Sequence, residues 1–165
     1  IRDRILIKLI PKHEYFMELA IEQAQQAEEE GEVPVGAIFV ENKEVIASAG
    51  NASIQLNDPT GHAEIRVLRQ AAKKKKNYRI GGTLYVTLEP CLMCMGSLIH
   101  ARVETLIFGA YDQKLGAATS VFDFSSSPDQ NHRIDFMGGV LEEQCQNLLK
   151  DFFKKQRKKV KRNQY

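Results

Sequence analysis

The amino-acid sequence predicts an α/β fold in which helices cover a mixed β-sheet. The expected elements begin with a helix and a β-hairpin, and strands then alternate with helices, an order typical of layered α/β domains. Of the 165 residues, 43% are hydrophobic and 27% charged, which allows one closed core and excludes disordered and collagen-like classes. We expect a single domain over residues 1–165, with its core at 13–157 and a basic helix end at 150–165.

The first half of the sequence predicts a helix, a hairpin and another helix. Apolar residues recur at helical spacing over 13–30, and Gly31 ends that helix. Two runs of β-forming residues, 35–40 and 45–50, surround a polar turn. Turn residues then lead to a helix expected over 62–73. The hairpin supplies the antiparallel part of the sheet.

The second half predicts three more strands and two helices. A short apolar run at 83–88 predicts a buried strand, followed by a helix over 91–101 and a strand over 104–109. An irregular stretch precedes a last short strand at 134–136. A long final helix completes the fold, and its apolar stripe consists of Leu141, Cys145, Leu148, Leu149, Phe152 and Phe153.

Composition also indicates where the protein acts. No apolar run approaches the roughly 20 residues that a bilayer span needs. Charged residues interrupt the apolar stretch 1–10, so it does not resemble a signal-peptide core. The three cysteines do not form the framework of a secreted disulfide protein. We therefore expect a cytoplasmic protein without a membrane partner.

The net charge of +2 is unevenly distributed. Residues 150–165 contain eight Lys or Arg and one acidic residue, Asp151, a net charge of +7. The rest of the chain carries 15 basic and 20 acidic residues, a net charge of −5. A basic end on an acidic body favours an anionic polymer partner. A solvated helix end explains the same charges equally well, because cations also stabilise a helix C-terminus.

Two short motifs indicate a metal site, and each stands at the start of an expected helix. They are His62-Ala63-Glu64 and Pro90-Cys91-Leu92-Met93-Cys94. Cys91 and Cys94 are three positions apart, so both sulfurs lie on one face of the first turn, where the helix dipole stabilises thiolates. With His62 they offer three ligands to Zn²⁺. Three protein ligands leave a position for water, as in catalytic zinc sites, whereas structural sites have four.

Glu64 favours the catalytic interpretation over its alternatives. It stands two residues from His62, close enough to exchange a proton with water that a metal activates. A redox Cys-x-x-Cys motif would not need this upstream His-x-Glu. A structural zinc site would need a fourth ligand from His13, His100, His132 or Cys145. Cys145 fits the apolar stripe of the last helix better than a metal site.

These motifs and longer stretches resemble a known family. His-x-Glu followed by Pro-Cys-x-x-Cys is the signature of zinc-dependent nucleobase deaminases. Residues 57–65, 84–91 and 131–133, and the ending around 151–153, resemble the bacterial tRNA-specific adenosine deaminases. The resemblance extends over residues 15–157, and the long segments are far more specific than the metal motif.

The resemblance implies a fold, an activity and partners. The fold would be the three-layer, cytidine-deaminase-like fold with a mixed five-stranded sheet. The activity would be hydrolytic conversion of adenosine to inosine at the wobble position of an arginine tRNA anticodon, by a homodimer with one Zn²⁺ per subunit and no nucleotide cofactor. The alternative is a deaminase of a free nucleobase or nucleoside, such as cytidine or guanine. The basic final helix favours the polymer substrate.

The resemblance also assigns roles to individual residues. His62, Cys91 and Cys94 match the zinc ligands, and Glu64 matches the proton shuttle. One of the two adjacent Phe residues at 152–153 is expected in the core, because neighbouring helix positions point about 100° apart. The chain departs from the family at Tyr111, where a basic residue is common. The implied contacts to base and RNA are Asn51, the backbone of Ala63, Pro34, Val35, Asp112, Asn131 and His132. With an RNA substrate, we expect the basic helix end to add Phe152 or Phe153 against a base and Lys154 on the phosphates.

Overall fold

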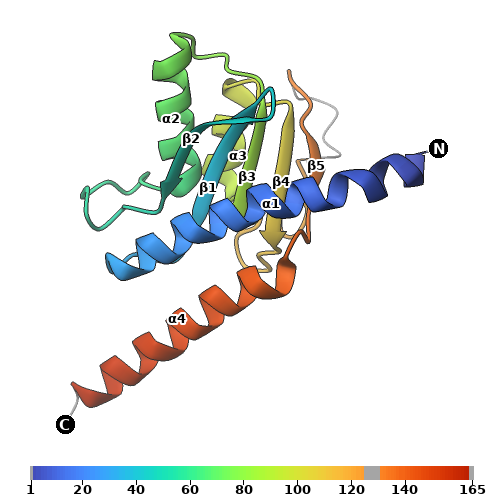
Figure 1. Ribbon diagram of the computed structural model, residues 1–165. Helices are drawn as coiled ribbons and strands as arrows, with labels where there is room; N and C mark the ends of the chain where they lie inside the picture. Colours follow the sequence, from blue (N-terminus) through green and yellow to red (C-terminus); the bar gives the residue numbers. More distant parts are fainter. Residues whose placement is uncertain (1, 125–130, 164–165) are drawn as a thin grey trace.

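In the computed structural model, which describes residues 2–124 and 131–163, four helices surround a five-stranded sheet (Figure 1). The strands alternate with the helices after an initial hairpin, as the sequence predicts. In chain order the elements are α1 (Arg2–Glu29), β1 (Gly36–Glu41), β2 (Glu44–Gly50), α2 (Ala63–Lys75), β3 (Thr83–Leu88), α3 (Leu92–His100), β4 (Thr105–Ala110), β5 (Asp135–Met137) and α4 (Glu142–Arg162).

The sheet is mixed, with strand order β2-β1-β3-β4-β5. β1 pairs antiparallel with both β2 and β3, whereas β4 runs parallel to β3 and β5. The parallel strands need crossover connections, and α3 provides the one between β3 and β4. The carboxyl ends of β3 and β4 therefore lie at the same edge of the sheet.

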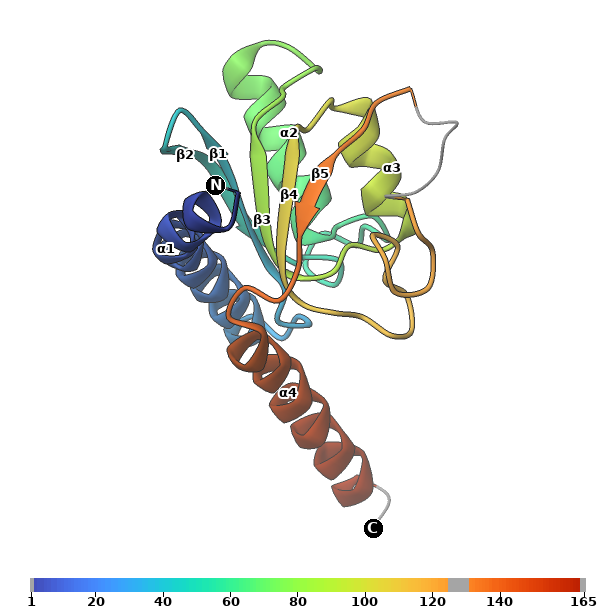
Figure 2. The same ribbon diagram turned by 90° about the vertical axis from the view of Figure 1, so that its right-hand side faces the viewer.

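Helices cover both faces of the sheet and make three layers (Figure 2). α1 and the start of α4 pack on one face, and α2 and α3 on the other. Each face of the sheet has its own hydrophobic core, and alternate residues of a strand pack into one core or the other, since successive side chains point to opposite faces. In β1, Phe39 faces α2 and α3 while Ile38 and Val40 face α1. This alternation confirms the predicted layered architecture.

Element boundaries agree with the sequence prediction except at α1. The helical backbone of α1 begins at Arg2. The prediction began at residue 13 because regular apolar spacing is clear only from there on. Gly36 lets α1 lie close against the sheet, since a Cβ there would meet the backbone of Ala20 and Ala24. Among the described helices, none is both long enough and apolar enough to cross a membrane.

Candidate active site

The site forms where α2 and α3 begin, at the carboxyl end of β3. His62 is the N-cap residue of α2 and Cys91 that of α3, each with an extended backbone. Within the described structure, neither side chain makes the usual capping hydrogen bond to its own helix. Both side chains instead point toward each other across the space between the helices. The helix starts thus present ligands instead of caps.

Three ligand atoms converge there. Nδ1 of His62 lies 3.7 Å from Sγ of Cys91 and 3.6 Å from Sγ of Cys94, and all three atoms lie within 4.8 Å of one another. This group can bind a metal ion. Over residues 2–124 and 131–163, no fourth His, Cys, Asp or Glu joins it. Cys145 is buried elsewhere, in the core shared by α1, α4 and the sheet, so the structural-zinc alternative lacks its fourth ligand.

The electrostatics of this group favour a cation. A hydrogen bond from the Cys94 thiol lowers the pKa of Cys91 to about 4, and the same hydrogen bond raises the pKa of Cys94. The contact with Cys91 raises the pKa of His62. Thiolate character on Cys91 favours a positive charge among these three groups, and a metal ion would supply that charge directly.

Glu64 lies in the first turn of α2 and lines the same cavity as His62 and Cys91. Its side chain is only 4% exposed. Burial raises the pKa of Glu64 to about 7. A carboxyl group that gains and loses a proton near neutral pH suits general acid–base catalysis.

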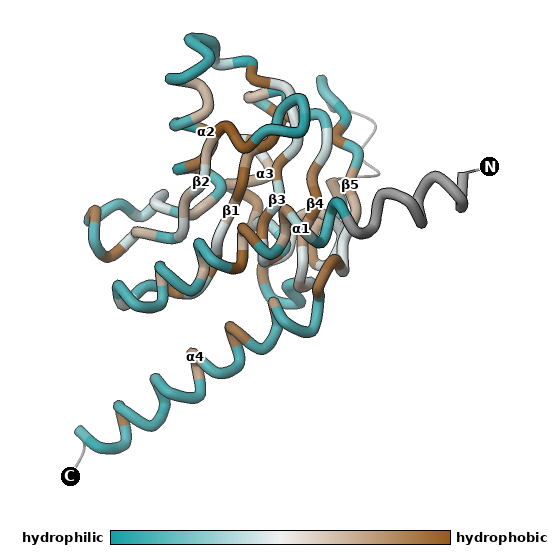
Figure 3. Tube along the Cα trace, in the orientation of Figure 1, coloured by the Kyte–Doolittle hydropathy of each residue, from teal (hydrophilic) through white to brown (hydrophobic). Residues whose placement is uncertain are grey.

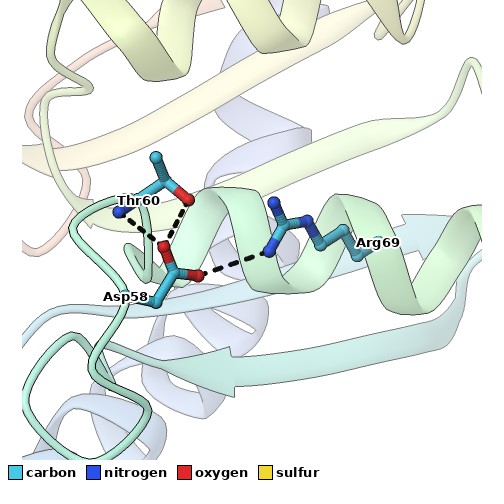
Figure 4. Close-up of polar contacts among 3 residues, drawn as sticks. All are labelled: Asp58, Thr60 and Arg69. Carbon is cyan, nitrogen blue, oxygen red and sulfur yellow. Dashed lines mark hydrogen bonds and ion pairs between the residues drawn. The ribbon is translucent and has the colours of Figure 1, made fainter.

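The loop between β2 and α2 fixes where His62 emerges. In this loop the Asp58 carboxylate accepts hydrogen bonds from the backbone N–H and the hydroxyl of Thr60, at 2.8 and 2.7 Å (Figure 4). The other carboxylate oxygen lies 3.4 Å from the Arg69 guanidinium on α2. These contacts tie the loop to the helix that it precedes, and the hydrogen bonds from Thr60 lower the pKa of Asp58.

Asn51 joins the end of β2 to the start of α2. Its Oδ1 accepts a hydrogen bond from the backbone N–H of Ala63, at 2.8 Å. The side chain also lines the cavity. Because the amide oxygen is engaged by Ala63, the Nδ2 group is the donor left for a ligand in the cavity.

The cavity has a volume of about 550 Å³. Its polar part beside the ligands contains His62, Cys91, Glu64, Glu89 and Asn51. The other walls are mostly apolar. They comprise Val33 and Val35 before β1, Leu88 at the end of β3, the segment 111–115 after β4, which adds the polar Asp112, Gln113 and Lys114, and Leu149 and Phe153 on α4.

Most residues assigned to substrate by the resemblance do lie at this cavity. Val35, Asp112 and Phe153 line it. Pro34 is buried between the lining residues Val33 and Val35, and Ala63 acts through its N–H to Asn51. Lys154 is exposed on α4 next to Phe153.

Three assigned residues are placed elsewhere. Phe152 is 7% exposed and turned into the protein, since adjacent helix positions point apart and Phe153 takes the cavity side. Asn131 and His132 lie beyond the opposite edge of the sheet, where Nε2 of His132 is 2.6 Å from the Val103 carbonyl oxygen just before β4. Among the described residues that line the cavity, neither appears.

Sequence reasoning missed Glu89 and most of the wall at 111–115. Glu89 is 2% exposed and accepts hydrogen bonds from Asp112, Thr119 and Ser120. Burial acts to raise its pKa, but these hydrogen bonds outweigh burial and lower it. The available signal was a charged residue directly after a buried strand. The wall itself lies in an irregular segment without periodicity.

Comparisons with known proteins agree with this geometry. A family described as MafB19-like deaminase matches residues 11–157, so the chain is a deaminase enzyme. The tRNA-specific adenosine deaminase of Haemophilus influenzae is 47% identical over 150 residues, covering 90% of this chain and 87% of that protein. The chain therefore belongs to the tRNA-specific adenosine deaminases.

Solved structures confirm the expected fold. A structure from a study of A-to-I editing by tRNA:A34 deaminases matches with a TM-score of 0.79 and 44% identity, covering 82% of this chain and 99% of that chain. A guanine deaminase structure from Bacillus subtilis matches with a TM-score of 0.60 and 32% identity, covering 76% of this chain and 83% of that chain. The deaminase of a free base is thus the more distant neighbour.

Proposed function

We propose that this protein hydrolyses the 6-amino group of adenosine at the wobble position of an arginine tRNA, giving inosine and ammonia. One observation carries the proposal: a metal-binding group, a buried carboxyl and an oriented amide share one cavity in a chain 47% identical to a tRNA-specific adenosine deaminase. Residues 1–165 would form one deaminase domain.

The donor set supports Zn²⁺, one per chain. With Zn–S near 2.3 Å and Zn–N near 2.0–2.1 Å, tetrahedral geometry separates S and N by about 3.6 Å. The two observed S···N distances, 3.6 and 3.7 Å, match this separation. Bound zinc would lower the pKa of a water molecule to about 7 and supply the nucleophile for attack at C6.

The chain's own residues would then orient the base and move protons. Glu64, buried beside the ligands, takes a proton from the attacking water and returns protons to the purine ring and to the departing amine. Nδ2 of Asn51 donates to an acceptor on the purine edge, while the Ala63 N–H holds the amide in that orientation. The apolar walls exclude bulk water from the reacting atoms.

Aromatic and basic side chains support an anticodon stem-loop as the partner. Tyr111 and Phe153 are 37% and 46% exposed at the cavity and can stack on unpaired bases of the loop. The carboxyl half of α4 projects beyond the body and is mostly hydrophilic (Figure 3). Its exposed cations would follow the phosphates: Lys154, Lys155, Arg157, Lys158, Lys159, Lys161 and Arg162.

We further propose a cytoplasmic homodimer. Exposed apolar side chains support the dimer, because a second copy of the chain would cover them. They include Ile54 at 68% and Leu56 at 55% on the loop before α2, and Leu92 at 47% on α3. Asn131 and His132 stay proposed RNA contacts, and the RNA would meet them outside the cavity of this chain. The molar mass in solution tests the dimer.

The deciding experiment measures inosine formation by the purified, zinc-loaded protein. The substrates are an arginine tRNA with adenosine at the wobble position, the same tRNA with guanosine there as a control, and free adenosine, cytidine and guanine. Conversion of only the adenosine-containing tRNA supports the proposal. Conversion of a free base or nucleoside would favour the alternative, which uses the same metal group and the same carboxyl.

A further inference from the structure

Glu89 is a buried carboxylate in an unusual position. It follows β3 directly and stands two residues before the ligand Cys91. Its carboxyl oxygens accept backbone N–H groups from Asp112 at 3.0 Å, Thr119 at 2.8 Å and Ser120 at 2.9 Å. The hydroxyls of Thr119 and Ser120 donate to it as well.

Among the described residues, the hydrogen bonds that stabilise this charge come from one segment. Among the ion pairs formed by described residues, none includes Glu89. The donors to Glu89 among the described residues lie at the two ends of the segment 112–120. A buried carboxylate needs such donors because an unpaired charge is costly to bury. Carboxylate and segment therefore depend on each other.

The same segment forms one wall of the cavity. Residues 111–115 line it, and the Asp112 carboxylate shapes their turn by accepting the N–H groups of Lys114 and Leu115. Gly116 passes directly over Glu89, where a Cβ would meet the carboxylate oxygen. The segment is also joined to the strand end by the Ala117 N–H, which donates to the Pro90 carbonyl at 2.8 Å.

We propose that Glu89 is a positioning residue that fixes this wall relative to the metal ligands and thereby sets affinity for the substrate. The proposal rests on the proposed function. Glu89 and Cys91 are two positions apart in the short link between β3 and α3, so the wall that Glu89 holds stays at a constant distance from the ligand Cys91. The groups that Glu89 places include Tyr111 and Asp112, which line the cavity beside the ligands.

The test replaces Glu89 by Gln, which keeps the shape but removes the charge. Whichever way the amide turns, one set of N–H donors then faces an NH₂ group. We expect KM for the tRNA to rise about 10- to 100-fold, the effect of losing a hydrogen bond to a buried charge. The kcat should stay within about threefold and the zinc content should be unchanged, since neither Glu64 nor a ligand moves. Glu89→Asp, which keeps the charge, should restore part of the affinity.

Glu32 provides a matched control. It is also 2% exposed, and its carboxylate accepts the N–H groups of Ile54 and Gln55 in the loop before α2. Neither Ile54 nor Gln55 is among the described residues that line the cavity. Glu32→Gln should lower the melting temperature as much as Glu89→Gln does, while leaving KM near the wild-type value. An equal rise of KM in both variants would overturn the proposal.

Amide hydrogen exchange tests the same contact without needing activity. In Glu89→Gln, the amides of residues 112–120 should exchange at least about tenfold faster, with those of 54–55 unchanged, and Glu32→Gln should show the reverse. Unchanged exchange at 112–120 would disprove the role of Glu89. If wild-type protein leaves the tRNA unedited, the proposed function fails, and the exchange pattern still decides whether Glu89 holds the wall.

A weaker variant keeps the proposal testable if Glu89→Gln does not fold. Ser120→Ala removes a single hydroxyl donor to Glu89 and leaves the backbone contacts in place. We expect KM to rise about threefold, as for one neutral donor, with kcat unchanged. A wild-type KM in this variant, together with wild-type exchange at 112–120, would count against the proposal.

Discussion

At the amino ends of α2 and α3, polar and ionisable groups are buried and held from several sides, whereas the carboxyl half of α4 carries its charges into solvent. Cys94 is fully buried and Glu64 is 4% exposed. Beyond Phe152, by contrast, the described residues of α4 are exposed except for the partly covered Gln156. Reaction chemistry needs fixed positions, and binding of a polyanion needs only reachable charge. The two regions should therefore respond very differently to substitution.

The largest effect should come from removing a ligand. Cys91→Ala leaves two of the three metal-binding groups, so we expect zinc content to fall below one tenth of an equivalent and turnover to fall by about 10⁴-fold or more. Metal analysis and inosine formation measure the two quantities. Cys145→Ala is the control, because that thiol is buried in the other core. Full zinc occupancy in Cys91→Ala would remove this residue from the site.

Glu64→Gln should separate metal binding from proton transfer. The amide keeps the volume of the carboxyl but cannot accept a proton, so we expect full zinc content and a loss in kcat of about 10³-fold, within the range for general acid–base catalysis. Single-turnover rates on the tRNA measure this. Glu30→Gln, at an exposed position just after α1, serves as the control. A Glu64→Gln enzyme with most of its activity would contradict the assigned proton path.

Asn51→Asp should have a smaller effect and should divide two roles of one side chain. The carboxylate still accepts the Ala63 N–H, so the loop stays attached to α2. The donor to the purine is lost, and we expect kcat/KM to fall about tenfold or more with little change in melting temperature. Asn51→Ala loses both contacts and should also lower the melting temperature. Equal melting temperatures for the two variants would show that the hydrogen bond from Ala63 does not stabilise the fold.

The sequence predicted those parts of the site that depend on local spacing. His62 and Cys91 are N-cap residues and Cys94 lies one turn later, so their meeting follows from helix geometry once both helix starts lie at one sheet edge. The hairpin and the alternation of strands with helices likewise predicted a mixed sheet, whereas the strand order came from the structure. Local pattern was therefore sufficient for the fold and the metal group.

The remaining parts depend on contacts between distant segments. The wall at 111–115 has no periodicity, and its place is set by Glu89, more than twenty positions earlier in the chain. The placement of Asn131 and His132 away from the cavity follows from the parallel pairing of β5 with β4, which puts their segment at the amino edge. Neither contact leaves a signal in residue spacing.

The smallest effect on chemistry should come from the basic half of α4. Lys158→Gln with Lys161→Gln removes two exposed cations beyond Phe153, the last α4 residue that lines the cavity. If each cation neutralises one phosphate, the slope of log affinity against log salt should fall by about 1.4–1.8, since released counterions scale with phosphates contacted. The kcat at saturating tRNA and the zinc content should not change.

The matched variant is Lys73→Gln with Lys76→Gln, which removes equal charge at the end of α2, and its slope should equal the wild-type value. An equal decrease in both variants would mean that net charge alone steers the tRNA, and an unchanged slope in the α4 variant would take this helix out of the RNA path.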